Sequence, residues 1–264
     1  MSVKTQVGRV LNVLAPSITN SRYLNRYTSG EPEIRLLPAL VPAGKIAIDV
    51  GANRGLYVHH LLKITPDVVA FEPLPPMQQW LRRNYGSRIR LEHVALSDTE
   101  GVAVIRFPRG NYSWATIAPT NTLDLSSGTD ARIEEIEVPL KTLDSYDFKN
   151  VGFLKIDVEG HEEDVLKGAS KLLESRPNLL IETEERHNPG STSRIPAYLA
   201  TLGFSGFYLS DGELRPLEEF SAGRDQPIES VGYSGKSGRY INNFLFVPTE
   251  SVATLKTTVG KLAA

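Results

Sequence analysis

From residue 45 onward, short apolar runs alternate with segments whose apolar residues recur at helical spacing. Short apolar runs bounded by turn residues are typical of buried strands, and their alternation with helices is typical of βαβ units. The pattern therefore predicts an α/β fold with a mainly parallel sheet. The expected strands are Lys45–Val50, Asp67–Phe71, Ile89–Ala95, Val102–Phe107, Ile133–Val138, Val151–Val158 and Asn178–Glu182.

Four segments between and after these runs predict helices, because apolar residues three or four positions apart share one helix face. The last of the four is expected to stop at Gly203, since glycine commonly follows the end of a helix. The apolar faces comprise Val58, Leu61 and Leu62; Met77, Trp80, Leu81 and Tyr85; Val165, Leu166, Ala169, Leu172 and Leu173; and Ile195, Tyr198, Leu199 and Leu202.

The C-terminal third predicts antiparallel strands. Phe204–Leu209 and Glu213–Leu217 flank the dipeptide Asp211-Gly212, which is a strong signal for a tight hairpin. Phe244–Val247 is a last expected strand. The parallel part of the sheet thus comes first in the chain, and an antiparallel edge follows it.

The two ends of the chain lie outside this pattern. Residues 1–44 predict an N-terminal helical extension, in which Val7, Val10, Leu11 and Leu14 recur at helical spacing. Residues 250–264 form a tail that is expected to be either a weak helix or disordered. The interpretation is one domain, residues 45–249, between these two segments.

Composition narrows the class of protein. The 264 residues carry a formal net charge of −2, which gives no electrostatic basis for general binding to nucleic acid or to anionic membranes. The chain has no cysteine, which excludes disulfides, thiolate metal ligands and a cysteine nucleophile. No apolar run approaches the length that a membrane-spanning helix needs. We expect a cytoplasmic, single-core protein without membrane insertion; its oligomeric state is open.

A glycine-containing turn follows the first expected strand, in the segment Asp49-Val50-Gly51-Ala52-Asn53-Arg54-Gly55. Glycines there allow positive φ and a close approach of ligand to backbone, and the following helix adds N–H donors. Glu72 ends the second strand 23 residues after Asp49, where doubly wound sheets place an acid that binds ribose hydroxyls. The combination predicts an adenosine-containing cofactor.

The details of the turn favour S-adenosylmethionine over a dinucleotide. A dinucleotide site prefers G-x-G-x-x-G, but Asn53 and Leu56 stand where its second and third glycines would be. S-adenosylmethionine has no pyrophosphate, so a site for it does not need the three closely spaced glycines. An NAD-dependent oxidoreductase is further disfavoured because no Tyr-x-x-x-Lys pair suggests that chemistry.

The chain resembles the FkbM family of S-adenosylmethionine-dependent methyltransferases over roughly Ile46–Glu185. The resemblance rests on IDVGANRGLY, VVAFEPLPP, VALSDTEG, KTLDSY and FLKIDVEGHEEDVLKGA, which occur in the family's order. It implies a Rossmann-like, seven-stranded sheet with a reversed terminal hairpin. It also implies methyl transfer to oxygen, commonly a hydroxyl of a sugar, a glycan or a natural-product scaffold, which leaves S-adenosylhomocysteine as product.

The resemblance implies roles for individual residues around the cofactor. Asp49, Gly51, Asn53 and Gly55 would surround its methionine part, and Glu72 would bind its ribose. Pro73, Leu74, Ala95 and Leu96 would lie near its adenine, and Asp157 would lie beneath the reactive methyl group. The implied cofactor-binding residues are Asp49, Gly51, Asn53, Gly55, Glu72, Pro73, Leu74, Ala95, Leu96 and Asp157.

An alcohol acceptor loses a proton, so we expect a base just beyond the expected strands Val151–Val158 and Asn178–Glu182. Each candidate also has a structural alternative. Asp157 could cap the following helix, and Glu159 and His161 could be first-turn residues of that helix. Glu182 would need a partner if it is buried at the strand end, and His187 could be an ordinary loop residue. The family often has Glu-x-His where this chain has Glu182-Thr183-Glu184. The catalytic candidates are Asp157, Glu159, His161 and Glu182, with His187 as a substrate-binding candidate.

Two further site predictions concern the acceptor and metals. Trp114 lies in the polar segment Asn111–Thr116, where the family has an acceptor-facing segment; it is either a stacking surface for the acceptor or a loop anchor packed on the core. No ligand spacing requires a metal, so none is expected. The alternative to an enzyme is a non-catalytic scaffold protein that binds an adenosine cofactor.

Overall fold

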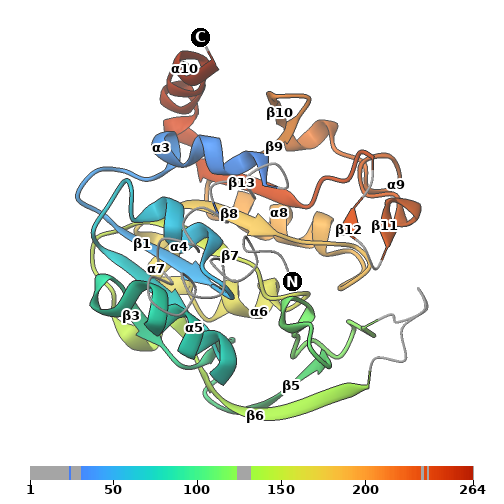
Figure 1. Cartoon of the computed structure of the whole chain (residues 1–264). Helices are drawn as coiled ribbons and strands as arrows, with labels where there is room; N and C mark the ends of the chain where they lie inside the picture. The colour runs from blue at the N-terminus through green and yellow to red at the C-terminus, as the bar shows by residue number, and fades with distance from the viewer. Residues whose placement is uncertain (1–23, 25–30, 124–131, 233–234, 237, 264) are drawn as a thin grey trace, which may run out of the picture.

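The computed structural model describes residues 24, 31–123, 132–232, 235–236 and 238–263. Its centre is an eight-stranded sheet with the order β10-β9-β13-β8-β7-β1-β2-β3 (Figure 1). Strands β3, β2, β1, β7 and β8 are parallel, whereas β13 runs antiparallel to both of its neighbours. The strands are β1 (Ile46–Val50), β2 (Val68–Phe71), β3 (Arg90–Glu92), β7 (Val151–Ile156), β8 (Asn178–Glu182), β9 (Phe204–Ser210), β10 (Glu213–Pro216) and β13 (Asn243–Pro248).

The central strands are buried on both faces, which is why they read as nearly continuous apolar runs. Alternate residues point to two separate cores: Ile48 and Val50 of β1 join the first core, and Ala47 joins the second. The first core contains apolar residues of the helices α6 (Glu162–Lys167), α7 (Ser170–Glu174) and α8 (Ser191–Thr201). The second contains those of α3 (Leu37–Leu40), α4 (Leu56–Leu61), α5 (Pro75–Tyr85) and α10 (Val252–Ala263).

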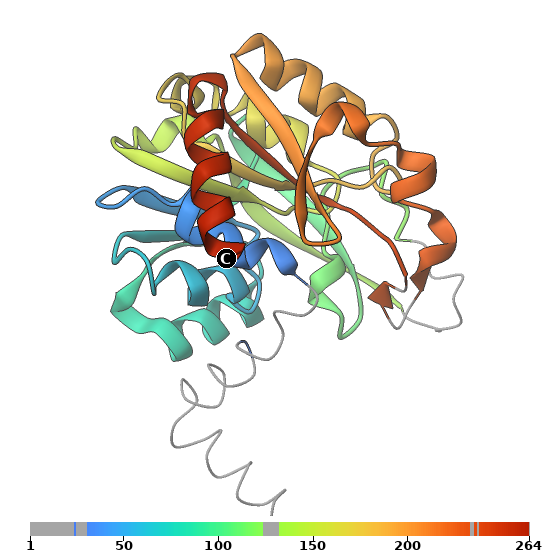
Figure 2. The same cartoon turned by 90° about the horizontal axis from the view of Figure 1, so that it is seen from above.

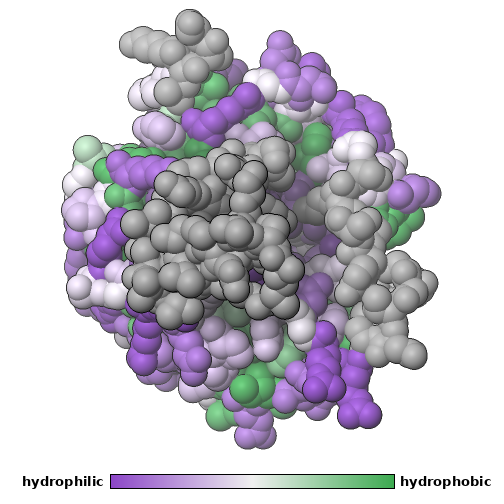
Figure 3. Space-filling model, viewed as in Figure 1, coloured by the Kyte–Doolittle hydropathy of each residue, from purple (hydrophilic) through white to green (hydrophobic). Residues whose placement is uncertain are grey.

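Two of the expected strands belong to a second, three-stranded sheet with the order β4-β6-β5. The expected strand Ile89–Ala95 is divided, because β3 pairs in the central sheet whereas β4 (Ala95–Leu96) pairs with β6 (Ile133–Lys141). Strands β5 (Gly101–Pro108) and β6 form a long antiparallel ribbon that extends away from the central sheet (Figure 1). Its burial alternates along β6, and hydrophilic side chains gather over its outer end (Figure 3).

The strand count of the central sheet differs by one from the seven expected. The hairpin predicted around Asp211-Gly212 is present as β9 and β10, and β10 adds an eighth strand at the edge. The mostly parallel sheet with antiparallel strands from the C-terminal part is otherwise as predicted. The remaining short elements are α9 (Ala222–Asp225), β11 (Val231–Gly232), β12 (Gly235–Lys236) and the 3-10 helices Pro32–Leu36, Gly86–Arg88, Tyr112–Trp114, Leu143–Tyr146, Leu217–Glu219, Ile228–Ser230 and Thr249–Ser251.

The single helix predicted over residues 165–173 is two helices, α6 and α7, with a break at Gly168. A Cβ atom at Gly168 would lie 1.9 Å from the carbonyl oxygen of Ser97. The Asp144 carboxylate accepts the backbone N–H groups of Lys171 and Leu172, so it caps the start of α7. The absence of a side chain at Gly168 thus lets the chain after β4 pass close to the helix pair.

Both ends of the described chain pack on the second core. Leu37 and Leu40 of α3 are fully buried, so residues 32–41 contribute to the fold, while the helical spacing predicted at Val7–Leu14 lies outside the described residues. Of the two expectations for residues 250–264, the helix is correct: α10 lies beside α3 (Figures 1 and 2), and Leu255 is buried.

Replacing Leu255 with alanine should therefore destabilise the whole domain. We expect Leu255→Ala to lower the free energy of unfolding by about 2–4 kcal/mol, because a buried leucine leaves a cavity. Urea denaturation monitored by circular dichroism measures this, with Thr254→Ala, an exposed position on the same helix, as control. A loss in Leu255→Ala no larger than in the control would show that α10 does not stabilise the domain.

Candidate active site

The carboxyl ends of β1, β2, β7 and β8 open into a cleft with two compartments that meet at Gly51, Asn53, Ser113, Asp157 and Glu159. We call them the apolar and the acidic compartment. The apolar compartment is further lined by Val50, Phe71, Glu72, Pro73, Leu74, Val94, Ala95, Leu96, Ile105, Tyr112, Ala115, Thr116, Ile117, Val158 and His161. The acidic compartment is further lined by Leu24, Glu31, Asp49, Ala52, Arg54, Leu56, Tyr57 and Glu182.

The turn after β1 is shaped by close packing against other parts of the protein. Gly51 has φ +82°, and a Cβ atom there would lie 1.8 Å from the carbonyl oxygen of Asp157. Gly55 has φ +79°, and its carbonyl accepts a hydrogen bond from the hydroxyl of Tyr85 on α5. The two glycines therefore allow β7 and α5 to approach the turn. Gly51 also lines both compartments, whereas Gly55 lines neither.

Glu72 connects the end of β2 to the turn. Its Oε2 accepts the backbone N–H of Asn53 at 2.7 Å, and its Oε1 accepts the N–H of Leu74 at 2.8 Å. Burial raises the pKa of Glu72 to about 7, although these two hydrogen bonds favour the ionised form. Each oxygen keeps a second acceptor position, and the side chain lines the apolar compartment.

The predicted adenine-binding residues lie together next to Glu72. Leu74, Ala95 and Leu96 are all buried and line the apolar compartment, as does Pro73. A flat apolar ligand would find complementary side chains here, beside one carboxylate at the strand end.

His161 stands on the wall of the apolar compartment, directly before α6. Its Nε2 is hydrogen-bonded to the Ser97 hydroxyl at 2.9 Å, and its Nδ1 lies 3.3 Å from the Asp164 carboxylate. Burial lowers the pKa of His161, and Asp164 partly offsets this shift. Both ring nitrogens thus already have protein partners.

The acidic compartment brings together carboxylates from distant parts of the chain around one buried lysine. Lys155 of β7 is fully buried, and its Nζ lies 3.9 Å from Asp157 Oδ2 and 4.0 Å from Glu182 Oε2. Asp49 is its cross-strand neighbour in the β1–β7 pair. Tyr57 of α4 places its ring 5.0 Å from the lysine nitrogen. Burial alone would lower the pKa of Lys155, but the surrounding carboxylates raise it above its ordinary value, so the ammonium is charged.

Three carboxyl groups of this compartment, those of Asp49, Asp157 and Glu159, hold protons more tightly than carboxyls in water. Burial raises the pKa of Asp49 to about 6, and its Oδ2 has no hydrogen-bond partner among the described residues. Burial and the neighbouring Glu182 raise the pKa of Asp157 well above its usual range, and Lys155 opposes this. Burial, followed by Asp157 and Glu182, raises the pKa of Glu159. A carboxyl whose pKa is raised keeps its proton to a higher pH, and its ionised form is a stronger base.

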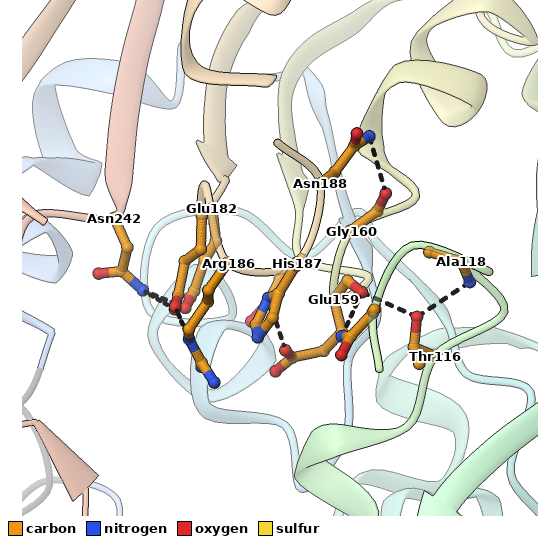
Figure 4. A network of polar contacts seen from close by, with 12 residues as sticks. Thr116, Ala118, Glu159, Gly160, Glu182, Arg186, His187, Asn188 and Asn242 are labelled. Atoms are coloured by element: carbon orange, nitrogen blue, oxygen red, sulfur yellow. Dashed lines mark hydrogen bonds and ion pairs between the residues drawn. The ribbon is translucent and has the colours of Figure 1, made fainter. Parts of the chain in front are cut away.

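Glu159 is held in a left-handed backbone conformation, with φ +57°. Its carbonyl accepts hydrogen bonds from Thr116 Oγ1 at 2.8 Å and Asn121 Nδ2 at 2.9 Å, and its carboxylate lies 3.2 Å from Nδ1 of His187 (Figure 4). Asn188 donates to the carbonyl of the next residue, Gly160. Segments after β5 and β8 therefore fix the loop that follows β7.

The structure brings most predicted site residues into this cleft, with three exceptions. His187 contacts Glu159 but lines neither compartment. Gly55 and Trp114 also lie outside both linings. Tyr112 and Ser113 of the segment around Trp114 do line the cleft, and Asn53 Nδ2 donates to Ser113 Oγ at 3.1 Å. This segment covers the apolar compartment and reaches the point where the two compartments meet.

Sequence reasoning missed several polar residues around the acidic compartment. Lys155 carried a visible signal, because it is a lone lysine in an otherwise apolar strand. The others carried none, since they come from distant segments: Tyr57 and Asn243 both donate to Glu31, and Asn242 donates to Glu182. A neighbouring cluster joins Glu184 to Arg186, Tyr240 and Asn242.

The described residues also bear on two other kinds of site. No group of three or more His, Asp or Glu side chains among them has the arrangement to hold a metal ion. Likewise, none of the helices in the described part of the chain has the length and apolar character to cross a bilayer.

Comparison with known proteins identifies the family. The model of the FkbM methyltransferase domain matches residues 49–205, which is more than half of the chain. The chain belongs to the FkbM methyltransferase family. The resemblance inferred from the sequence motifs is confirmed.

Relatives of this methyltransferase differ widely in size. The methyltransferase sdnD of Sordaria araneosa is 26% identical over 198 residues, covering 63% of this chain and 76% of sdnD. The hexuronic acid methyltransferase AglP of Haloferax volcanii is 28% identical over 169 residues, covering 61% of this chain and 65% of AglP. The AMB antimetabolite synthetase AmbE of Pseudomonas aeruginosa is 24% identical over an alignment of 208 residues, and the match covers 65% of this chain and 10% of AmbE.

The chain also resembles proteins of known structure. The FkbM methyltransferase of Methylobacillus flagellatus is 16% identical with a TM-score of 0.47, over 76% of this chain and 43% of that one. SMU.1697c of Streptococcus mutans, solved with S-adenosylhomocysteine, is 10% identical with a TM-score of 0.45, over 82% of this chain and 96% of that one.

Replacing the buried lysine should destabilise the protein, because the neighbouring carboxylates lose the positive charge that compensates them. We expect Lys155→Met to lower the free energy of unfolding by about 3–5 kcal/mol at pH 8, because Asp157 and Glu182 lose their common cation. A carboxyl whose pKa is higher in the folded than in the unfolded state binds more protons when folded, so its contribution to stability falls as pH rises. The variant raises the pKa of Asp157 further.

The deficit of Lys155→Met relative to the parent should therefore be smaller at pH 5 than at pH 8. Urea denaturation at both pH values tests this, and Lys141→Met, an exposed position on β6, is the matched control. A deficit that does not change with pH would mean that lost packing, rather than lost charge, causes it.

Proposed function

We propose that this protein transfers a methyl group from S-adenosylmethionine to a hydroxyl oxygen of a sugar, a glycan or a natural-product scaffold. The observation that carries the cofactor half of the proposal is the Glu72 carboxylate, which two backbone N–H groups hold at the end of β2 beside an apolar compartment. The acidic compartment next to it supports the second half, because it offers carboxyl groups that can accept a proton.

The residues of the cleft suit the parts of this cofactor. Glu72 would accept hydrogen bonds from the ribose hydroxyls, with Leu74, Ala95 and Leu96 against the adenine. The Oδ2 of buried Asp49, which has no hydrogen-bond partner in the described part of the chain, would bind the ammonium of the methionine part, since a buried carboxylate oxygen gains most from a charged donor. When bound, the cofactor supplies an electrophilic methyl group on a sulfonium.

The protein's own contribution to the transfer is alignment and removal of one proton. The acceptor oxygen forms a bond to the methyl carbon as the sulfur–carbon bond breaks, and the hydroxyl proton goes to a carboxylate of the enzyme. Asp157 and Glu159 lie where the compartments meet, and their raised pKa values suit a base. His161 and His187 would act by positioning, because they contact Ser97 and Asp164, and Glu159, respectively.

The acceptor class is supported by the names of the relatives, since AglP is named for a hexuronic acid and AmbE for synthesis of an antimetabolite. Both names point to small molecules or glycans as partners. We propose the same for this chain, in the cytoplasm, with no role for nucleic acid or a metal. Tyr112 and Ser113, at the mouth of the cleft, would contact the acceptor together with neighbouring Trp114.

Cofactor binding is the first test. Calorimetric titration should show binding of S-adenosylmethionine and S-adenosylhomocysteine but not of NAD. Glu72→Ala should weaken binding of both ligands by about 1.5–3 kcal/mol, because charge-assisted hydrogen bonds to ribose are lost. Glu100→Ala, at an exposed glutamate, is the control. Binding of NAD alone would refute the proposal, and unchanged affinity in Glu72→Ala would remove the ribose assignment.

Catalysis is tested separately, by methyl transfer to a panel of hydroxylated acceptors with product analysis by mass spectrometry. We expect Asp157→Asn and Glu159→Gln each to lower kcat roughly 10²-fold or more, while the affinity for S-adenosylhomocysteine changes only a few-fold. Full activity in both variants would leave positioning alone as the source of catalysis. Cofactor binding without turnover on any acceptor would instead indicate a non-catalytic scaffold protein.

A further inference from the structure

The loop after β7 contains one peptide unit that three side chains hold from both sides. Its carbonyl, which belongs to Glu159, accepts hydrogen bonds from Thr116 Oγ1 at 2.8 Å and Asn121 Nδ2 at 2.9 Å. Its N–H, which belongs to Gly160, donates to Oε1 of Glu162 at 2.8 Å. Hydrogen bonds weaken steeply when their geometry is lost, so a rotation of this peptide plane would break all three. We call Thr116, Asn121 and Glu162 the peptide clamp.

The members of the peptide clamp come from separate segments and are withdrawn from solvent. Thr116 and Asn121 lie in the chain between β5 and β6, whereas Glu162 is the first residue of α6. The exposed fractions of the three residues are 2%, 3% and 1%. Leaving a buried polar group without its partner costs the full desolvation of that group, so these hydrogen bonds strongly favour one orientation of the peptide.

The oriented peptide gives Glu159 a backbone conformation that residues with a side chain rarely adopt. Its φ is +57°, in the left-handed region, and the φ of Gly160 is +105°. Such a conformation is strained for a glutamate and persists only where the surroundings determine it, and strain of this kind is concentrated at functional sites. A glycine would adopt it freely, so a glutamate at this position indicates a role for its side chain.

Glu159 stands where the two compartments of the cleft meet. It lines both of them, and its carboxylate lies 3.2 Å from Nδ1 of His187 (Figure 4). The next residue has little freedom, because a Cβ atom at Gly160 would lie 3.1 Å from that of His187 and 3.3 Å from that of Ala118. With the chain confined there, the direction of the Glu159 side chain is set by the peptide that the clamp holds.

We infer that Thr116, Asn121 and Glu162 are positioning residues for methyl transfer, because they orient the peptide that directs the Glu159 carboxylate towards the reacting hydroxyl. The inference rests on the proposed function, in which Glu159 is one of the two bases. The three residues act through Glu159 rather than on the reacting atoms. Loss of one hydrogen bond of the peptide clamp should therefore misplace the base and lower kcat, with little effect on the cofactor.

Thr116 allows a sharp test, because a matched threonine lies at the amino end of the sheet. Oγ1 of Thr116 donates to a carbonyl and accepts the N–H of Ala118, two residues later. Oγ1 of Thr65 likewise donates to the carbonyl of Lys45 and accepts the N–H of Asp67. Both threonines are 2% exposed, so Thr116→Val and Thr65→Val remove equivalent hydrogen bonds from equally buried positions. Thr116→Ser keeps the hydroxyl.

Methyl transfer to the panel of hydroxylated acceptors gives the first readout. We expect Thr116→Val to lower kcat about tenfold or more, while the KM of the acceptor and the affinity for S-adenosylhomocysteine change less than about threefold. Thr116→Ser should recover most of the activity. Thr65→Val should keep the parental kcat, although urea denaturation shows a similar loss of stability. Equal losses of kcat in the two valine variants, or full activity in Thr116→Val, would refute the positioning role.

Glu162 tests the other side of the peptide. Glu162→Gln keeps an oxygen that can accept the N–H of Gly160, whereas Glu162→Ala removes it. We expect the alanine variant to lose kcat about as strongly as Thr116→Val, again about tenfold, and the glutamine variant to lose much less. Equal losses in the two variants would remove Glu162 from the peptide clamp.

The histidine side chains give a readout that needs no acceptor. Because the Glu159 carboxylate lies beside Nδ1 of His187, a displaced Glu159 changes the ring signals of His187 in a nitrogen–proton NMR spectrum. These signals are assigned from the spectrum of His187→Gln. We expect Thr116→Val to shift them in the same direction as Glu159→Gln does, and Thr116→Ser and Thr65→Val to leave them in place.

The two readouts separate the inference from the proposed function. His187 signals that stay in place in Thr116→Val would overturn the inference and leave the proposed function intact. A parent protein that binds no S-adenosylhomocysteine would overturn the proposed function, and the inference with it.

Discussion

The ammonium of Lys155 is the interaction on which the arrangement of this protein depends. It lies inside the central strand β7, with no access to solvent, and it faces carboxyl groups at the ends of β7 and β8 and from the neighbouring strand β1. A buried charge is tolerated only when other charges and hydrogen bonds surround it closely. The lysine and the acids therefore require each other, and the strands that carry them are held in one register.

The apolar compartment is organised differently from the surroundings of Lys155, because its main contacts involve the backbone. Glu72 binds two peptide N–H groups, and Gly51 allows the carbonyl of Asp157 to approach the turn after β1. Contacts of this kind depend little on which side chains surround them. The cleft thus combines a compartment shaped mainly by backbone contacts with a compartment whose charge is set by side chains.

Local pattern was enough to predict most of the central sheet and to select residues that lie together in the apolar compartment. Strands β1, β2, β7 and β8 are apolar runs between clear turns, and Glu72 follows the glycine turn at a spacing that the fold dictates. Pattern could not distinguish the central sheet from the β5–β6 ribbon, because both contain apolar runs and only tertiary pairing separates them. Nor could it predict that Glu31 meets Asn243, since more than two hundred residues separate them.

The position of β13 has a consequence for how the chain is made. Residues 243–248 form the strand between β8 and β9, so its two neighbours are synthesised well before it. Until residue 248 has left the ribosome, the facing edges of β8 and β9 have no partner, and unpaired strand edges readily bind other chains. The interval between translation of β9 and of β13 is therefore the period in which the nascent protein is most exposed to misassembly and most dependent on chaperones.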